Sequence, residues 1–363
     1  MNSKVTSIIS AVLLLAVCAC NGGKENPTEP TDNVKTSPEA LAFTAEPQTL
    51  ALTVNAGEAF QAYCNDDWVS VDPSYTAAAS GTVNVTVAEN MDFEPRSTEL
   101  VIKAGTVRHK VAVTQAGATA PSIVAPEGYR LVWNDEFDKA GKPDENEWWY
   151  ETGGGGWGNN ELQNYVAQAK DGEELAVVSG GSLKVTAKKI GSTVYSIRMN
   201  TRKAWTYGWI EAKLKVSDAH GSWPAFWMMP QNYKTWPGDG EIDIMEYAIS
   251  TQGKNKSSSS IHCNAFNWPA GTQKTHVQSV ANAATEYHVY ALEWTAEEMK
   301  FYVDGKQHLV FKNDGKGYDH WPFDAPFYLK LNLAYGGNMG GKMDESQLPA
   351  IYEVDYVRVF KKK

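Results

Sequence analysis

Apolar and polar residues alternate along most of the chain, beginning near residue 41. The runs 82–87, 110–114 and 352–360 show this period of two, and Gly, Pro and Asn residues separate such runs. A period of two with turn residues at each end is typical of β-strands that bury one face. Stretches with the helical period are scarce, so the pattern predicts an all-β protein.

The alternating runs fall into two blocks, divided by short segments rich in proline and polar residues. We predict a signal segment, a flexible linker, an Ig-like β-sandwich, a second linker and a larger β domain, which cover 1–20, 21–38, 39–117, 118–128 and 129–363. Short strands over about 80 residues suit a sandwich. The longer block suits a jelly roll of two curved antiparallel sheets with a concave groove.

The N-terminus has the features of an export signal. The apolar run 8–17 is too short to span a bilayer and is typical of a signal peptide. The sequence Val-Cys-Ala-Cys that ends at Cys20 resembles a bacterial lipobox with Ala19 before an acylated Cys20; Cys18 is the other candidate, with a valine at the cleavage position. Together with the polar tether that follows, this sequence resembles surface lipoproteins of the Bacteroidetes. The resemblance implies a lipid-anchored outer-membrane protein at the cell surface.

Three carboxylates crowd into six residues of the larger block: Glu241, Asp243 and Glu246. The Gly and Pro residues before them predict a turn, and the interleaved Ile and Met residues predict a strand. Strict alternation places Glu241 and Asp243 on one face and Glu246 on the other. A β-bulge near Ile244 or Met245 would return Glu246 to the face of Glu241, and bulges are favoured beside active sites.

Carboxylates grouped on one face suit the hydrolysis of glycosidic bonds. A retaining glycoside hydrolase needs a nucleophile and an acid/base about 5–5.5 Å apart. Four strand steps cover about 13 Å on a flat strand, so the sheet must curve for the two Glu side chains to meet. We predict that Glu241 attacks the anomeric carbon, that Glu246 is the acid/base with a raised pKa, and that Asp243 assists by hydrogen-bonding Glu241. The alternative is a half-buried strand whose acids only face solvent.

The segment 240–246, Gly-Glu-Ile-Asp-Ile-Met-Glu, resembles the signature of glycoside hydrolase family 16 in the bulged form of its laminarinase-like branch. Further motifs in the family's order lie at 156–163, 207–212, 222–227, 290–294 and 321–329. The resemblance covers nearly all of the larger block and implies the family's concave-grooved β-jelly roll. It also implies an endo-acting retaining β-glucanase that cuts internal β-1,3 or β-1,4 bonds of laminarin or mixed-linkage β-glucan, with no cofactor for catalysis.

The same resemblance implies a set of residues that hold the sugar. They are Asn160, Glu161, Arg198, Trp223, Trp227, Trp236 and His262, and Gln163 belongs with the first two to a segment near the groove. Each has a structural alternative, although Trp223, beside Gly221 and Ser222, is the better candidate for the groove. Trp227 lies between apolar neighbours and could be a core residue, Arg198 could be a surface charge, and His262 could be a structural histidine that does not touch the acids.

Members of the family often hold a structural Ca²⁺ on the convex side of the jelly roll. The acidic positions that match this site are Glu136 and Asp355, near the two ends of the larger block. Carboxylate oxygens suit Ca²⁺. The resemblance therefore implies a possible calcium site that stabilises the fold and takes no part in the chemistry.

The smaller block resembles the BACON domain, an Ig-like module, at 68–71, 94–98 and 111–117. The name implies carbohydrate binding. The segment holds one Trp, Trp68, and no row of aromatic residues that would suit an extended sugar chain. We favour a rigid spacer that holds the enzyme away from the membrane.

Composition and charge exclude several other classes of protein. The chain of 363 residues has a net charge of -10 and no long Lys/Arg run, which disfavours nucleic acid and anionic membrane surfaces; a lipid anchor is the membrane attachment that we expect. Two of the four cysteines belong to the export signal, and Cys64 and Cys263 are not expected to pair. Thirteen Trp residues suit stacking on sugar rings. We expect a monomer that acts on a β-glucan polysaccharide.

Two alternative functions fit the same signature. The chemistry could act on a marine galactan, since agarases, porphyranases and carrageenases share the bulged motif. We favour glucan because 158–163 and 261–267 look glucanase-like and because no basic cluster suggests a sulfated substrate. A glycan-binding protein without catalysis is the other alternative, against which the presence of all three acids argues.

Overall fold

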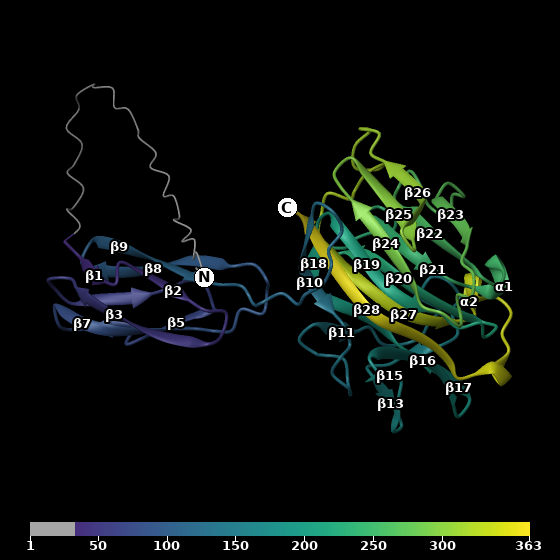
Figure 1. Cartoon of the computed structure of the whole chain (residues 1–363), viewed down its shortest axis with the longest axis horizontal. Coiled ribbons are helices and arrows are strands. Elements are labelled where there is room, and N and C mark those ends of the chain that lie inside the picture. Colours follow the sequence, from purple (N-terminus) through teal and green to yellow (C-terminus); the bar gives the residue numbers. More distant parts are fainter. Residues whose placement is uncertain (1–32) are drawn as a thin grey trace, which may run out of the picture. The chain divides into compact units, whose positions relative to one another are not determined.

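The computed structural model describes residues 33–363 (Figure 1). The predicted signal segment, Cys20 and most of the predicted linker 21–38 lie outside the described residues. The described chain divides into two compact units. One holds the described residues up to Glu89 together with Arg96–Ala116, and the other holds Asn90–Pro95 and Gly117–Lys363.

The first unit is a β-sandwich whose strands bury alternate residues, such as Val83, Val85 and Val87. One sheet has the order β1 (Lys35–Ser37), β3 (Gln48–Asn55), β7 (Ser80–Val87) and β5 (Val69–Asp72). The other sheet has the order β2 (Ala40–Phe43), β9 (Val107–Gln115), β8 (Arg96–Ala104), β4 (Phe60–Tyr63) and β6 (Tyr75–Thr76). Buried residues from both sheets form one core, which confirms the predicted sandwich.

Strand structure begins inside the segment predicted to be a linker, which corrects that boundary. Strand β1 pairs antiparallel with β3, from Lys35 opposite Asn55 to Ser37 opposite Thr53. Its sequence, Lys-Thr-Ser, contains no apolar residue, and an edge strand can be held by backbone hydrogen bonds to one neighbour. The hydrophobic pattern therefore could not reveal it. In the predicted second linker, 118–128, the chain forms no helix or strand.

The second unit consists of two large sheets that are almost wholly antiparallel (Figure 1). The ten-stranded sheet has the order β12 (Asn164–Tyr165), β17 (Thr193–Ser196), β16 (Ser182–Ile190), β28 (Ala350–Lys362), β19 (Gly208–Lys215), β24 (His288–Trp294), β25 (Glu298–Val303) and β26 (Lys306–Lys312), with β10 (Tyr129–Asp135) beside β28 and β15 (Ala176–Ser179) beside β16. The seven-stranded sheet has the order β11 (Trp148–Tyr150), β18 (Arg198–Trp205), β27 (Phe327–Tyr335), β20 (Ser222–Pro230), β21 (Glu241–Glu246), β22 (Lys256–His262) and β23 (Lys274–Ser279).

The inner faces of these two sheets enclose the core of the second unit. Strand β27 shows the arrangement: Leu329, Leu331 and Leu333 belong to the core, whereas Lys330 and Asn332 line a cavity on the opposite face of the sheet. A period of two along each strand thus separates residues that stabilise the fold from residues that face the cavity. The architecture confirms the prediction of an all-β chain with a two-sheet second domain.

The remaining elements are short. They are the hairpin of β13 (Ala169–Lys170) and β14 (Glu173–Glu174), the single turns α1 (Ile249–Gln252) and α2 (Gly337–Gly340), and the 3-10 helix η1 (Glu345–Gln347). Among residues 33–363, no helix has the length and apolar character needed to cross a membrane. Cys64 and Cys263, the two cysteines in this part of the chain, are free thiols.

Candidate active site

Strand β21 carries the three predicted catalytic carboxylates and contains a bulge. The successive partners of Trp227 and Phe226 on β20 are Asp243 and Met245, which leaves Ile244 as an extra residue. The register also shifts against β22. Ile244 and Met245 both belong to the hydrophobic core, so the glutamate that follows returns to the cavity face. The bulge predicted at this place is confirmed.

The backbone before Glu241 requires a glycine. Gly240 has a φ of 93°, a conformation that residues with a Cβ rarely adopt. A Cβ at this position would lie 2.7 Å from the ring of Phe323 and 3.0 Å from Pro322. The glycine therefore lets the chain turn closely over these two rings as it enters β21, and this turn fixes where Glu241 begins the strand.

The three carboxylates open into one cavity. Glu241, Asp243 and Glu246 line a space of about 860 Å³ on the outer face of the seven-stranded sheet. Ligand sites commonly enclose about 300–1,000 Å³. The cavity is rich in aromatic rings, which can stack on the apolar faces of sugars; they are Trp157, Trp223, Trp227, Tyr233, Trp236, Trp268 and Tyr328.

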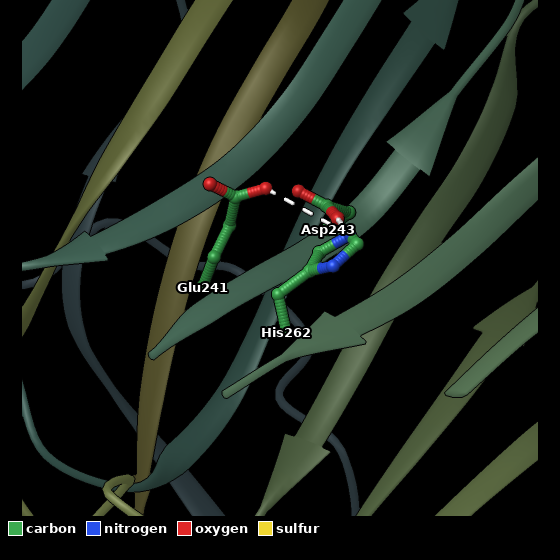
Figure 2. Close-up of side chains that lie close together, drawn as sticks. All are labelled: Glu241, Asp243 and His262. Atoms are coloured by element: carbon green, nitrogen blue, oxygen red, sulfur yellow. Dashed lines mark ion pairs between the residues drawn. The ribbon is translucent and has the colours of Figure 1, made fainter. Parts of the chain in front are cut away.

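Glu241 and Asp243 lie beside His262 (Figure 2). Trp236 donates its indole N–H to Oε2 of Glu241 at 2.9 Å, which aims this carboxylate. His262 Nε2 lies 3.3 Å from Oδ2 of Asp243 and 3.9 Å from Oε1 of Glu241. Burial, followed by the charge and hydrogen bonding of Glu241, raises the pKa of Asp243 well above its usual value. This rise favours the protonated form of Asp243, which lies next to Glu241.

Glu246 has a different environment, as an acid/base requires. Trp223 donates its indole N–H to Oε1 at 3.2 Å, and the hydroxyl of Ser258 lies 3.5 Å from Oε2. Burial, and then the negative charge of Asp243, raise the pKa of Glu246 to about 8. A carboxyl with this pKa is protonated at neutral pH and can donate the proton to a leaving oxygen.

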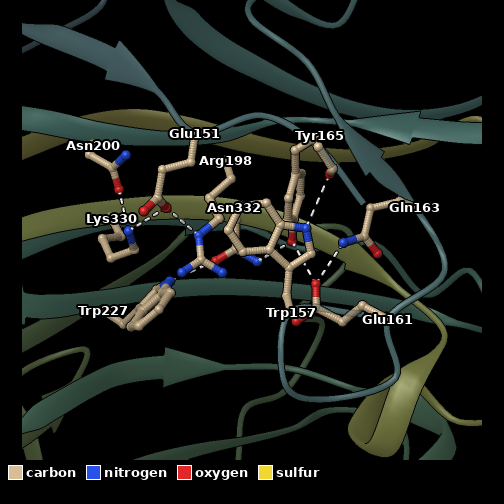
Figure 3. A network of polar contacts seen from close by, with 11 residues as sticks. Glu151, Trp157, Glu161, Gln163, Tyr165, Arg198, Asn200, Trp227, Lys330 and Asn332 are labelled. Atoms are coloured by element: carbon tan, nitrogen blue, oxygen red, sulfur yellow. Dashed lines mark hydrogen bonds and ion pairs between the residues drawn. The ribbon is translucent and has the colours of Figure 1, made fainter. Parts of the chain in front are cut away.

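Arg198 and Trp227 belong to a polar network at one side of the cavity (Figure 3). The guanidinium carbon of Arg198 lies 4.6 Å from the ring centre of Trp157 and 4.9 Å from that of Trp227. Trp227 also donates its N–H to Asn332 at 2.6 Å. Both side chains line the cavity, so Arg198 is not a surface charge and Trp227 is not a core residue.

Glu161 and Asn160 lie differently from one another. Glu161 lines the cavity, and its Oε2 accepts hydrogen bonds from Gln163 at 2.6 Å and Tyr165 at 3.1 Å. Burial raises the pKa of Glu161, and these bonds oppose that rise. Asn160 does not line the cavity, although its neighbour Asn159 does. Asn160 has a left-handed backbone with a φ of 57°, and its amide donates at 2.9 Å to Asn338, which does line the cavity. Asn160 thus holds a lining residue, and its own contact with the sugar stays a prediction.

The model of glycosyl hydrolases family 16 matches residues 163–358, more than half of the chain and the whole of β21. The chain belongs to glycosyl hydrolases family 16. It is therefore a glycoside hydrolase with a site built for this chemistry. A second model, described as a putative N-terminal binding domain and named BACON, matches residues 58–116 in the sandwich.

Relatives of the family 16 domain have the same fold and related activities. A β-glucanase of Rhodothermus marinus is 42% identical over 251 residues, which cover 64% of this chain and 85% of the relative. The solved laminarinase from Rhodothermus marinus superposes with a TM-score of 0.61 at 40% identity and covers 64% of this chain and 97% of its own. SCLam, a non-specific endo-β-1,3(4)-glucanase, has a TM-score of 0.61 at 38% identity and covers 66% and 94%. These likenesses confirm the predicted family 16 fold.

The residues of the family 16 domain that were predicted to bind calcium are paired with cations instead. Glu136 forms a two-point ion pair with Arg358, with distances of 2.9 Å and 2.7 Å. Asp355 pairs with Lys213 at 2.7 Å. A Ca²⁺ site needs carboxylate oxygens that are free to converge on the ion. The donor set at Glu136 and Asp355 does not fit calcium. Among the described residues, one group of acids and histidine is close enough to hold a metal ion, and it is the cluster of Glu241, Asp243 and His262 itself.

Several residues of the family 16 cavity were not found from the sequence, and three of them surround Arg198. Lys330 and Glu151 line the cavity beside Arg198, and Trp157 covers the guanidinium. Lys330 had a recognisable signal, because it alternates with Leu329 and Leu331 in a largely apolar strand. Trp157 follows a run of four glycines, which is a signal for a special backbone path. Glu151 had none.

Deleting Ile244 should leave the fold and part of the activity intact. Met245 then takes the core position of Ile244, and regular alternation keeps all three carboxylates on the cavity face. A misplacement of about 1 Å can cost about 10²-fold, so we expect kcat/KM on β-glucan to fall by at most that order.

Deleting Ile242 is the matched control, since it also removes one fully buried isoleucine of β21. This deletion reverses the face of Glu241 relative to Asp243, and we expect no detectable hydrolysis. Equal losses of kcat/KM in the two deletion variants would contradict the role of the bulge.

Proposed function

We propose that this chain is an endo-acting retaining β-glucanase that hydrolyses internal β-1,3 or β-1,4 bonds of laminarin, mixed-linkage β-glucan or both. The observation that carries the proposal is the pairing of two glutamates with different surroundings in one aromatic cavity. Trp236 donates to Glu241, and burial raises the pKa of Glu246 to about 8. The similarity to enzymes named β-glucanase, laminarinase and endo-β-1,3(4)-glucanase supports the choice of glucan.

The first step transfers the glycosyl unit to the protein. Glu241 attacks the anomeric carbon while the bond to the leaving oxygen breaks, and Glu246 gives its proton to that oxygen. Asp243 holds a proton and hydrogen-bonds the attacking carboxylate, which places Glu241 and limits the negative charge of the cluster. The part of the glucan that carries the new hydroxyl leaves the cavity.

The second step returns the enzyme to its starting state. Glu246, now a carboxylate, takes a proton from water, and the water oxygen attacks the anomeric carbon and displaces Glu241. Two inversions at one carbon retain its configuration. Trp223, which donates to Glu246, favours the carboxylate form that this step needs.

Chromatography of the products from laminarin, mixed-linkage β-glucan, agarose and porphyran tests the proposal. We expect oligosaccharides of several lengths to form early from one or both glucans, because an endo-acting enzyme cuts at internal bonds. If products form only from agarose or porphyran, the substrate is a galactan and the proposal of a glucan is wrong. If the protein binds glucan and forms no product, it acts as a glycan-binding protein and the proposal of an enzyme is wrong.

The pH profile of kcat/KM on glucan should fall on the alkaline side near the pKa of Glu246. This pKa is raised to about 8, so the acid form is present below that pH and is lost as the pH rises through it. Above this point the rate should fall about tenfold per pH unit. The Trp223→Phe variant loses a bond that lowers this pKa, so its alkaline limb should move to higher pH. An alkaline limb that does not move would contradict the contact between Trp223 and the acid/base.

We further propose that Cys20 is lipidated and holds the enzyme on the outer surface of the cell, with the sandwich as a spacer and the protein as a monomer. The lipobox-like sequence before Cys20 supports the anchor. Labelling of cells with a palmitate analogue, followed by surface proteolysis, tests it: the wild-type chain should carry the label and be accessible, and Cys20→Ala should not carry the label. The sandwich core shares no residue with the core of the hydrolase domain, which suits a separate spacer.

A further inference from the structure

Glu151, which directly follows β11, presents one free carboxylate oxygen to the cavity. Arg198 Nε and Lys330 Nζ both donate to Oε2 of Glu151, the lysine at 2.6 Å (Figure 3). Within residues 33–363, no hydrogen bond ends on Oε1. The Glu151 side chain is 23% exposed and lines the cavity. Oε1 is thus an acceptor that a ligand can reach.

Arg198 presents free donors beside this acceptor. Its guanidinium is held between the rings of Trp157 and Trp227, and its Nε is bound to Glu151. The terminal N–H groups make no hydrogen bond to any described residue, and Arg198 also lines the cavity. Each sugar hydroxyl can both donate and accept a hydrogen bond. An acceptor and several fixed donors side by side therefore match adjacent hydroxyls on one pyranose ring.

Lys330 is too deeply buried to act as a main sugar contact. Its side chain is 1% exposed, and Nζ donates to Asn200 and to Glu151, each at 2.6 Å. It also lies 5.0 Å from the ring centres of Trp227 and Tyr328. A buried amine in this position holds the carboxylate of Glu151 against Arg198.

The charges around Lys330 explain why Glu151 stays ionised. Burial alone would raise the pKa of Glu151, but the charges of Arg198 and Lys330 outweigh it and the pKa is lowered. Burial and the charge of Arg198 lower the pKa of Lys330 to about 7, against the attraction of Glu151 and of Glu241. The cation that supports Glu151 is therefore lost when the pH rises above neutrality.

Glu151, Arg198 and Lys330 lie several strands away from the strand that carries the catalytic acids. Asn200 pairs with Lys330, Lys330 with Trp227, and Trp227 with Asp243, so one row of residues crosses from β18 to β21. Three strand spacings correspond to roughly 14 Å. A sugar held by Glu151 and Arg198 would therefore lie away from the bond that is cut. Binding of such a remote unit can supply energy that helps the reaction at the cleaved bond.

We propose that Glu151 adds an acceptor to the sugar contact expected of Arg198, so that the two residues hold adjacent hydroxyls of one glucosyl unit, and that Lys330 is the positioning residue that holds Glu151 for this contact. The proposal rests on the proposed function, because it requires a glucan chain in the cavity. Glu151 is the specificity-determining residue of the subsite. Lys330 acts through Glu151.

Calorimetry with a soluble β-glucan oligosaccharide tests the subsite in a Glu246→Gln background, which slows turnover strongly and removes the titration of Glu246. Adding Glu151→Gln, which keeps the size of the side chain, should raise Kd about tenfold. In the background variant, Kd should rise from about pH 6 to about pH 8 as Lys330 loses its proton. Adding Lys330→Met should raise Kd at the lower pH, because the charge that holds Glu151 is missing. It should also make Kd depend less on pH, because no amine at position 330 loses a proton.

Lys215→Met is the matched control, since Lys215 pairs with Glu353 on the other sheet and should leave Kd unchanged. The other groups of the cavity are identical in the background variant and in the variant with Lys330→Met, so the difference between the two pH profiles belongs to Lys330. An unchanged Kd in Glu151→Gln overturns the subsite even if Lys330→Met fails to fold. An unchanged pH slope in folded Lys330→Met overturns the role of Lys330. If the background variant binds no glucan oligosaccharide, the proposed function falls together with the subsite; if it binds and the added variants bind equally well, the subsite alone falls.

Discussion

Replacing Glu241 with Gln should lower kcat on β-glucan by about 10⁴-fold or more while the glucan still binds, because an amide cannot form the covalent intermediate. The amide keeps the size of the carboxylate and can still accept the indole N–H of Trp236. The cavity should therefore keep its shape. Initial rates and calorimetric affinity for the same glucan separate the loss of chemistry from a loss of binding.

Glu298→Gln is a suitable control for the change of Glu241. Glu298 is a glutamate on β25 that pairs with Lys300 at 2.7 Å and does not line the cavity. We expect wild-type rates from this variant. Turnover by Glu241→Gln at more than a small fraction of the wild-type rate would reject Glu241 as the nucleophile.

Replacing Glu246 with Ala should lower hydrolysis of the polysaccharide by about 10²–10⁴-fold, because the change removes the group that protonates the leaving oxygen. Substrates with a good leaving group, such as an aryl β-glucoside of a short glucan, need no acid in the first step. The variant should still transfer their glycosyl unit to Glu241, and the covalent intermediate should then accumulate because the base for the second step is also missing. A burst of released phenol followed by slow turnover is the expected record.

Added azide sharpens the test of Glu246, since it can attack the intermediate without a general base. We expect azide to restore turnover of the aryl substrate by Glu246→Ala and to give a glycosyl azide of retained configuration. It should not accelerate the wild-type enzyme to the same extent. Equal losses on the aryl substrate and the polysaccharide, with no effect of azide, would show that Glu246 is not the acid/base.

The local sequence was sufficient to predict the centre of this site. Glycine, then acids between apolar residues, predicted the turn and the strand, and the conflict between strict alternation and three acids on one face predicted the bulge near Ile244. These features depend on the geometry of a single strand. Few local conformations of this strand place Glu241 and Glu246 on the same face, and the proposed chemistry requires both on that face.

The flank of the cavity could not be predicted in the same way. Glu151 follows β11, and Arg198 and Lys330 lie on β18 and β27. No local pattern states that these three strands lie side by side. The calcium prediction failed for a related reason. Glu136 and Asp355 are acidic in sequence, but their carboxylates are bound by Arg358 and Lys213, whose positions depend on pairings between distant strands.

The bulge in β21 also changes what residue spacing can tell about such sites. Glu241 and Glu246 are five positions apart, an odd number, which by simple strand arithmetic excludes them from a common face. The extra residue at Ile244 makes the interval even in structural terms. A search for paired acids that accepts only even intervals along predicted strands would pass over this enzyme. Ile244 and Met245, which lie next to each other between the acids, both face the core. A rule for finding such pairs must therefore ask which residues between the acids face the core, and not only how many positions separate the acids.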